Sequence, residues 1–360
     1  MTVRAWIAAL ICSALLAACG GSGSHQHKAA PTDVTTVASA KPVAPSAVRP
    51  PLAPEQALVT AETENRLLVV ELPSGRVVRR IALPPDPEDI ATAPPAWGKG
   101  RLAVVSSPAA REVSLLEGTT LRPVKTFGGF DAPHIVELWP VVNGFDAYVT
   151  DDARGTLSVI DLSRERVTST IHVGGNAHHM GLDYIHQMAW VALGESATTI
   201  VILGTEDSAH PKILSRFSPG FEVHDLAVQD VGDGALRLWI TAANRSDVTV
   251  LDEVDRRVLF RVPVGPAPQH VALTERYAYL TSGYGSTIEQ VDARTGRVLR
   301  RAGTPYGSFE LAADDRYVVV SSLLRGTLAI FTPQLKLLRV VQLAPATREV
   351  ALSLPGGSPP

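Results

Sequence analysis

A short strand-like run recurs seven times along this chain, at spacings of about 40 to 49 residues. The copies are Leu58-Val59-Thr60, Val104-Val105-Ser106, Tyr148-Val149-Thr150, Trp190-Val191-Ala192, Trp239-Ile240-Thr241, Tyr279-Leu280-Thr281 and Val319-Val320-Ser321. Further short apolar runs, bounded by Asp, Gly or Pro, bring each unit to four strand-length segments. This period with four strands per unit is typical of a β-propeller blade. The repeat therefore predicts an all-β, seven-bladed β-propeller.

The clearest copy of the repeat is the stretch from Val248 to Thr281. Its four apolar runs are Val248–Leu251, Val258–Val264, His270–Leu273 and Tyr277–Thr281. Each has the length and the Val, Leu and aromatic content of a β-strand. We therefore expect four strands here.

The first repeat lacks one strand, because residue 57 leads directly into Leu58-Val59-Thr60. An unmatched run, Arg348 to Leu352, appears at the other end of the propeller sequence. We therefore predict that this carboxy-terminal strand pairs into the first blade and closes the ring, which would remove exposed sheet edges. The predicted propeller spans residues 57–354, followed by a flexible tail over residues 355–360.

Several segments resemble the YVTN-type β-propeller repeat family. They are Tyr148-Val149-Thr150-Asp151, Leu157-Ser158-Val159-Ile160-Asp161, Thr170-Ile171-His172-Val173-Gly174 and Pro268-Gln269-His270-Val271-Ala272. The resemblance covers about residues 57–353 and implies a seven-bladed propeller. Members of that family have many activities, so the fold does not settle the function.

The amino terminus has the pattern of a secretory signal. Arg4 is followed by an apolar run that is too short to span a bilayer. Its end, Leu16-Ala17-Ala18-Cys19, resembles a bacterial lipoprotein signal, which implies removal of residues 1–18 and lipid attachment to Cys19. Residues 19–56 are rich in Gly, Ser, Ala, Thr and Pro and predict a disordered tether. We therefore expect a protein anchored by lipid to the cell membrane, outside the cytoplasm on the extracellular or periplasmic face.

Composition excludes some functions. The formal net charge is −3, and no Lys/Arg run gives the basic face of a nucleic-acid-binding protein. The two cysteines, Cys12 and Cys19, precede the predicted propeller, so no thiol chemistry is expected there. Motifs for a nucleophile elbow, a P-loop, a zinc protease or a dinucleotide site are absent from the sequence. The main prediction is a non-enzymatic module that binds a ligand or a protein partner at its channel mouth.

Histidines gather before the predicted innermost strands. His134, His179 and His270 each precede an apolar pair, His224 lies one residue earlier in its copy, and His178 adjoins His179. Acidic residues take this aligned position in other copies, namely Asp89, Asp225, Glu310 and Glu349. Because the innermost strands line the channel of a propeller, these side chains predict a ring at one mouth.

Imidazoles and carboxylates are ligands that Zn and Cu favour, so the ring is a candidate metal site. Its histidine content is similar in kind to that of periplasmic zinc chaperones and of the copper propeller of nitrous oxide reductase. His25, His27 and His178 are auxiliary candidates. The alternatives stay open: Pro133-His134 fits the ordinary repeat, a wet channel needs no metal, and opposite blades are far apart. A zinc or copper metallochaperone is therefore the alternative function, and a lactonase- or hydrolase-type enzyme is a third.

Other polar residues are expected to be structural. Asp151-Asp152 and Asp314-Asp315 lie in predicted turns, where solvated carboxylates are common. His172, His186 and His210 lie away from the ring and are expected to be structural or exposed.

Overall fold

The structure is a computed structural model that describes residues 55–93, 100–194, 197–232, 236–267 and 269–353. All of these belong to one folded unit, which spans residues 51–360. Cys19, His25, His27, the tether and the tail lie outside the described residues, so the predictions for them stay predictions. The described residues include one helical turn, η1 (Glu62–Glu64), and hold no helix with the length and apolar character needed to span a bilayer.

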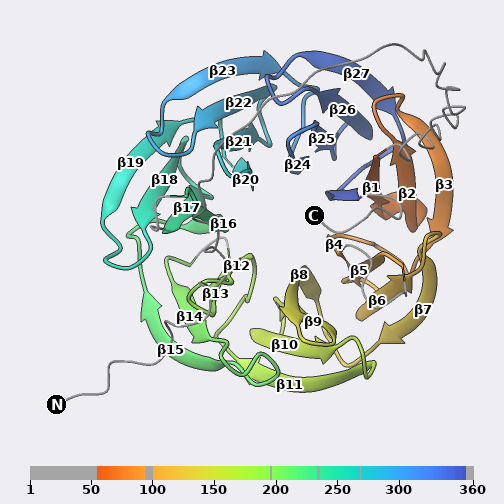
Figure 1. Ribbon diagram of the computed structural model, residues 1–360, viewed down its shortest axis with the longest axis vertical. Helices are drawn as coiled ribbons and strands as arrows, with labels where there is room; N and C mark the ends of the chain where they lie inside the picture. The colour runs from red at the N-terminus through yellow and green to blue at the C-terminus, as the bar shows by residue number, and fades with distance from the viewer. Residues whose placement is uncertain (1–54, 94–99, 195–196, 233–235, 268, 354–360) are drawn as a thin grey trace, which may run out of the picture. The chain divides into compact units, whose positions relative to one another are not determined.

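Seven four-stranded antiparallel sheets surround a central channel (Figure 1). From the innermost strand outward, blade 1 consists of β28 (Val350–Ser353), β1 (Gln56–Ala61), β2 (Arg66–Glu71) and β3 (Arg76–Ala82). Blade 2 consists of β4 (Ile90–Ala93), β5 (Leu102–Ser107), β6 (Glu112–Glu117) and β7 (Arg122–Phe127). Blade 3 consists of β8 (Pro133–Val141), β9 (Gly144–Asp151), β10 (Thr156–Asp161) and β11 (Arg166–His172). Blade 4 consists of β12 (Met180–Asp183), β13 (Met188–Ala192), β14 (Ile200–Gly204) and β15 (Lys212–Phe217).

The remaining blades follow the same order. Blade 5 consists of β16 (Val223–Asp230), β17 (Leu236–Ala242), β18 (Asp247–Asp252) and β19 (Val258–Pro263). Blade 6 consists of β20 (Gln269–Leu273), β21 (Tyr277–Ser282), β22 (Thr287–Asp292) and β23 (Val298–Gly303). Blade 7 consists of β24 (Leu311–Ala313), β25 (Val318–Ser322), β26 (Thr327–Phe331) and β27 (Leu337–Gln342). The predicted all-β, seven-bladed propeller is confirmed.

The predicted closure is also confirmed. Strand β28 pairs antiparallel with β1, so that Val350 lies opposite Val59 and Ala351 opposite Leu58. Val350 is 2% exposed and packs in a core cluster with residues of blades 7 and 1. The two ends of the propeller sequence are thus joined within one sheet.

Burial explains the repeat pattern. The two middle strands of each blade are packed on both faces, as in β5, where every residue is buried. The outermost strands have one face in solvent, and β27 is mostly exposed. Every blade also has a register shift between its two outer strands. Such irregularities increase the local twist of a sheet.

Glu55, just before β1, is a buried carboxyl at the corner between blades 7 and 1. It is 1% exposed, and Arg316 Nη1 lies 3.4 Å from its Oε2. Burial raises the pKa of Glu55 to about 8, and a hydrogen bond with Asp314 adds to this effect. Because the folded state keeps a proton that the unfolded state loses above its ordinary pKa of 4.5, this carboxyl lowers stability as pH rises towards about 8.

We expect Glu55→Gln to gain stability relative to the parent protein across that pH range. The two proteins should have similar melting temperatures near pH 4.5, and the variant should melt higher at about pH 8 and above. Thermal denaturation at several pH values measures the difference. A difference that does not change with pH would contradict the protonated state of Glu55.

Candidate metal centre at the channel mouth

Two successive residues just before, or at the start of, each inner strand lie near the channel mouth, and most of them line its cavity. Strand pairing shows which residues are equivalent: Val136 pairs with Val149, Met180 with Val191, and Val271 with Leu280. The residues immediately before these, the second tier, are Asp89, Ile135, His179, Asp225, His270, Glu310 and Glu349. The residues one place earlier, the first tier, include Glu88, His134, His178, His224, Phe309 and Arg348.

This pairing corrects the predicted alignment of His134. The sequence pattern placed it with His179 and His270, but Ile135 holds that position and His134 belongs with His178 and His224. The cause is a register shift between Pro133 and Val136 in β8, which the sequence does not reveal. The ring therefore has two tiers instead of one.

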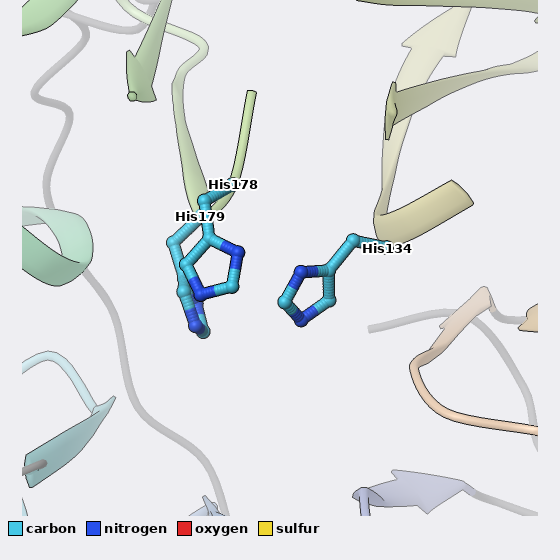
Figure 2. A group of neighbouring side chains, drawn as sticks. All are labelled: His134, His178 and His179. Atoms are coloured by element: carbon cyan, nitrogen blue, oxygen red, sulfur yellow. The ribbon is translucent and has the colours of Figure 1, made fainter. Parts of the chain in front are cut away.

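Five imidazoles from four adjacent blades, blades 3 to 6, meet in one cluster. Ring centroids are 4.1 Å apart for His134 and His178, 4.7 Å for His178 and His179, and 4.7 Å for His179 and His224. His224 and His270 follow at 4.8 Å. Figure 2 shows His134 facing His178 and His179 of the neighbouring blade. The predicted histidines are therefore brought together, because they come from neighbouring blades and not from opposite ones.

Two groups of three histidines could each hold one ion. They are His134, His178 and His179, and His179, His224 and His270, with the ligand nitrogens of each group within 4.8 Å of one another. His179 belongs to both groups. The Nε2 atoms of His224 and His270 are 3.1 Å apart. Two ligands about 2.1 Å from one metal ion lie about 3.0 to 3.4 Å from each other, so this spacing suits a shared ion.

In four of these five rings, a carboxylate oxygen lies within hydrogen-bonding distance of Nδ1. Asp152 Oδ2 lies 3.2 Å from His134 Nδ1 and 2.9 Å from His178 Nδ1. Asp225 Oδ1 lies 3.2 Å from His179 Nδ1, and Glu310 Oε1 lies 2.9 Å from His270 Nδ1. A carboxylate that accepts a hydrogen bond from Nδ1–H leaves the Nε2 lone pair available, which is the usual arrangement behind metal-bound histidine.

Burial keeps two imidazoles of the cluster in the neutral form. Burial lowers the pKa of His179 to about 4. Burial also lowers the pKa of His224 well below its ordinary value, and the neighbouring His179 and His270 add to the effect. These imidazoles are neutral at physiological pH, which is the form that binds a metal. For His134 and His270 burial is again the largest effect and lowers the pKa, but neighbouring carboxylates together outweigh it and raise the pKa. They are Asp152 and Glu88 for His134, and Glu310 and Asp225 for His270.

The predicted acidic ligands have other partners. Asp89 Oδ2 accepts a hydrogen bond of 2.5 Å from Val136 N, and Asp225 Oδ2 accepts one of 3.3 Å from Val271 N. These bonds join neighbouring blades. Glu349 accepts from Val350 N, and its burial beside Glu310 and Asp89 raises its pKa well above the ordinary value. Asp89 and Glu349 belong to neither histidine group, while Asp225 and Glu310 orient histidines.

Asp152 is the residue that sequence reasoning missed. We expected a solvated turn carboxylate, but its side chain is only 30% exposed and contacts two imidazoles. It directly follows β9, whose end lies at the face where the adjoining β8 begins, because the two strands are antiparallel. That topology is the signal that could have placed it beside the ring.

The cluster lines a cavity of about 360 Å³ that also includes Tyr284, Phe309 and Arg348. Arg348 forms an ion pair with Glu88 on the side away from the histidines of blades 4 and 5. Tyr284 is 55% exposed and packs against Phe309, with ring centroids 5.5 Å apart. The mouth is therefore open to solvent and has a mixed polar and aromatic wall.

The three remaining described histidines lie outside the cluster. His172 is exposed at the end of β11, and His210 is exposed beside Asp207. His186 is also exposed, as expected, but it contacts two buried carboxylates, Asp183 and Glu253.

No protein-family model matches the sequence, and no curated protein matches it either. Solved structures share the fold. A functionally unknown protein from Desulfotomaculum acetoxidans has a TM-score of 0.68 at 13% identity, over 82% of this chain and 98% of its own. Kuenenia stuttgartiensis hydrazine synthase has a TM-score of 0.63 at 12% identity, over 82% and 99%. Apo AztD from Citrobacter koseri has a TM-score of 0.62 at 9% identity, over 83% and 98%. At these identities the likeness concerns the β-propeller fold alone.

Proposed function

We propose that this protein is a non-enzymatic metal-binding protein that holds a Zn or Cu ion at the mouth of its propeller channel. The observation that carries the proposal is the convergence of five imidazoles from four blades, with nitrogens of His224 and His270 at 3.1 Å. Two imidazole nitrogens packed this closely gain little from each other unless a proton or a metal ion lies between them. A metal ion satisfies the whole group at once.

The donor set favours particular ions. Its donors are neutral nitrogens, and imidazole suits Zn and Cu better than it suits Mg or Ca. Three histidines and an open position form a well-known zinc environment. The carboxylates Asp152, Asp225 and Glu310 supply the charge behind the ligands, so the ion would be compensated without direct carboxylate binding.

Sharing of His179 sets the expected stoichiometry. When Asp225 holds the Nδ1–H of His179, a single nitrogen of that ring remains to bind a metal. The two histidine groups are then alternative positions for one ion, and we propose one tightly bound ion at the mouth. Two adjacent positions would also give the ion a short path through the cluster.

The amino-terminal sequence adds a location to the proposal. A lipid on Cys19 and a tether over residues 19–56 would hold the propeller at the membrane outside the cytoplasm. Metal ions entering or leaving the cell pass through that space. We therefore propose a role in metal binding or delivery there, with a membrane-associated partner.

A titration of the metal-free, full-length protein in detergent tests the function. Competition with a colorimetric zinc chelator should give one ion bound at the mouth. In Asp225→Asn, His179, the residue that both histidine groups share, loses the carboxylate at its Nδ1, and Zn affinity should fall by about 10- to 100-fold whichever position the ion takes. Asp207→Asn, at an exposed carboxylate near His210, is the matched control and should leave affinity unchanged.

Equal affinity in Asp225→Asn and the control would argue against histidine ligation supported by Asp225. If the parent protein competes with the chelator no better than buffer does, the metal proposal is wrong. The second candidate, a ligand- or protein-binding module, would then remain. It is favoured by the exposed Tyr284 that packs on Phe309 at the same mouth.

A further inference from the structure

A second group of metal-ligand side chains lies at the other end of β12. His179 precedes this strand and Asp183 ends it, so the two groups are separated by about 13 Å of strand. Asp183 is joined there by His186, from the turn between β12 and β13, and by Glu253, from the turn between β18 and β19 of blade 5. The group therefore bridges two blades and shares no residue with the channel-mouth cluster.

The three side chains converge on one point. His186 Nδ1 lies 3.0 Å from Asp183 Oδ2 and 3.4 Å from Glu253 Oε2. Those separations match the spacing of about 3.0 to 3.4 Å between two ligands that share one ion. The side chain of Asp183 is fully buried and that of Glu253 is 3% exposed, while that of His186 is 41% exposed. Solvent thus reaches the group from the histidine side.

The other oxygen of Asp183 fixes this geometry. Asp183 Oδ1 accepts hydrogen bonds of 2.9 Å from the backbone N–H of Ile185 and of 2.9 Å from that of His186. These bonds form the turn and explain why an aspartate stands there. They leave Oδ2 directed at His186, so one carboxylate serves both the turn and the group.

No comparable turn hydrogen bond among the described residues explains the glutamate at position 253. Its backbone N–H donates to Leu236 O, as the N–H of Leu162 donates to Phe145 O in blade 3 and that of Ala293 to Arg276 O in blade 6. Leu162 and Ala293 are 3% and 1% exposed. The equivalent residues of blades 1, 3 and 6 are therefore buried and apolar, and blade 4 has the buried but uncharged Thr205, whereas blade 5 has a carboxylate. A buried carboxylate costs free energy unless a cation compensates it.

The corner between blades 7 and 1 shows how the fold places an arginine beside a buried acid and a half-buried one. There Glu55 and Asp314 interact, and the permanently charged Arg316 lies 3.4 Å from Glu55. At the corner between blades 4 and 5, the imidazole of His186 contacts the buried carboxylates in place of an arginine. Arg256, three residues after Glu253, stacks over Phe217 at 5.5 Å and donates to Ser215, and it forms no ion pair with Glu253 in the described structure although its charge favours the ionised carboxylate.

We propose that Asp183, His186 and Glu253 bind a divalent first-row transition cation, with water completing its coordination. The ion would take the place of the proton that His186 Nδ1 shares with the two carboxylates, and that proton would pass to solvent. Two carboxylates and one imidazole are a harder ligand set than the all-histidine mouth, which makes Mn²⁺ a suitable probe. The site does not depend on the proposed function of the channel mouth.

Electron paramagnetic resonance of Mn²⁺ with the full-length protein tests this site, because bound Mn²⁺ loses the sharp signal of the free ion. We expect one Mn²⁺ bound per chain, with loss of binding in His186→Ala and in Glu253→Leu. His179→Ala, which affects only the channel mouth, should bind Mn²⁺ as the parent protein does. Failure of this site would therefore be visible whether or not Zn binds at the mouth.

Glu253→Leu also separates a metal site from a structural contact. Leucine is the residue at the equivalent positions of blades 1 and 3, so without metal the variant should melt at or above the temperature of the parent protein. Added Mn²⁺ should raise the melting temperature of the parent protein alone. Absence of Mn²⁺ binding in the parent protein, or binding that survives both His186→Ala and Glu253→Leu, would overturn the proposal.

Discussion

Replacing His179 with alanine should lower the affinity of the channel mouth for Zn by about 100-fold or more, since even loss of a supporting carboxylate typically costs 10- to 100-fold. His179 is the residue that both histidine groups share. Removing it leaves two imidazoles in each group, and neither remaining pair forms a three-ligand site. Competition titration of the metal-free, full-length protein measures the change.

The control is His172→Ala, because His172 is exposed at the end of β11, the outermost strand of blade 3. It should bind Zn as tightly as the parent protein. Circular dichroism and the melting temperature without metal would show whether His179→Ala keeps its fold. A folded His179→Ala protein with unchanged Zn affinity would mean that the ion, if bound, lies elsewhere.

Val350→Asp should destabilise the propeller by about 3 to 5 kcal/mol, because it places an unpaired charge in a dry core. Val350 is 2% exposed on the closing strand β28 and packs with Val59 and Val319. The melting temperature should therefore fall by several degrees. Thermal or chemical denaturation measures this loss.

Val340→Asp is the matched control. Val340 is 45% exposed on β27, the outermost strand of blade 7, so the same substitution there should change stability by about 0.5 kcal/mol or less. If both variants lost equally little stability, β28 would not be docked in blade 1, and the ring would not be closed by this strand.

The fold could be predicted because every blade buries the same two middle strands. Burial on both faces requires apolar runs such as Leu102–Ser107, and the repeat of these runs has a period that only a few architectures share. The closing strand was predictable by the same logic, since the first repeat lacked an inner strand and the last residues supplied one.

The candidate sites were predictable only in part. The ring histidines were found because they precede inner strands, but a register shift in β8 placed His134 in the first tier instead of the second. The choice of partners was not visible, because the contact of Asp152 with two imidazoles depends on side-chain packing between blades. Glu253 and His186 are 67 residues apart and meet only through the packing of two turns, which no local pattern records.

The position of the closure has a consequence for how a bound ion would protect the protein. Strands β28 and β1 pair through four residue pairs. They come from opposite ends of the propeller sequence, so no turn connects them, and their pairing closes the ring within blade 1. The clustered histidines lie in blades 3 to 6, so a bound ion would stabilise the contacts among those blades. It would not stabilise the pairing of β28 with β1 in blade 1. A ligand stabilises a protein only against openings that disrupt its site. Metal loading would thus resist complete unfolding while the ring could still part at blade 1.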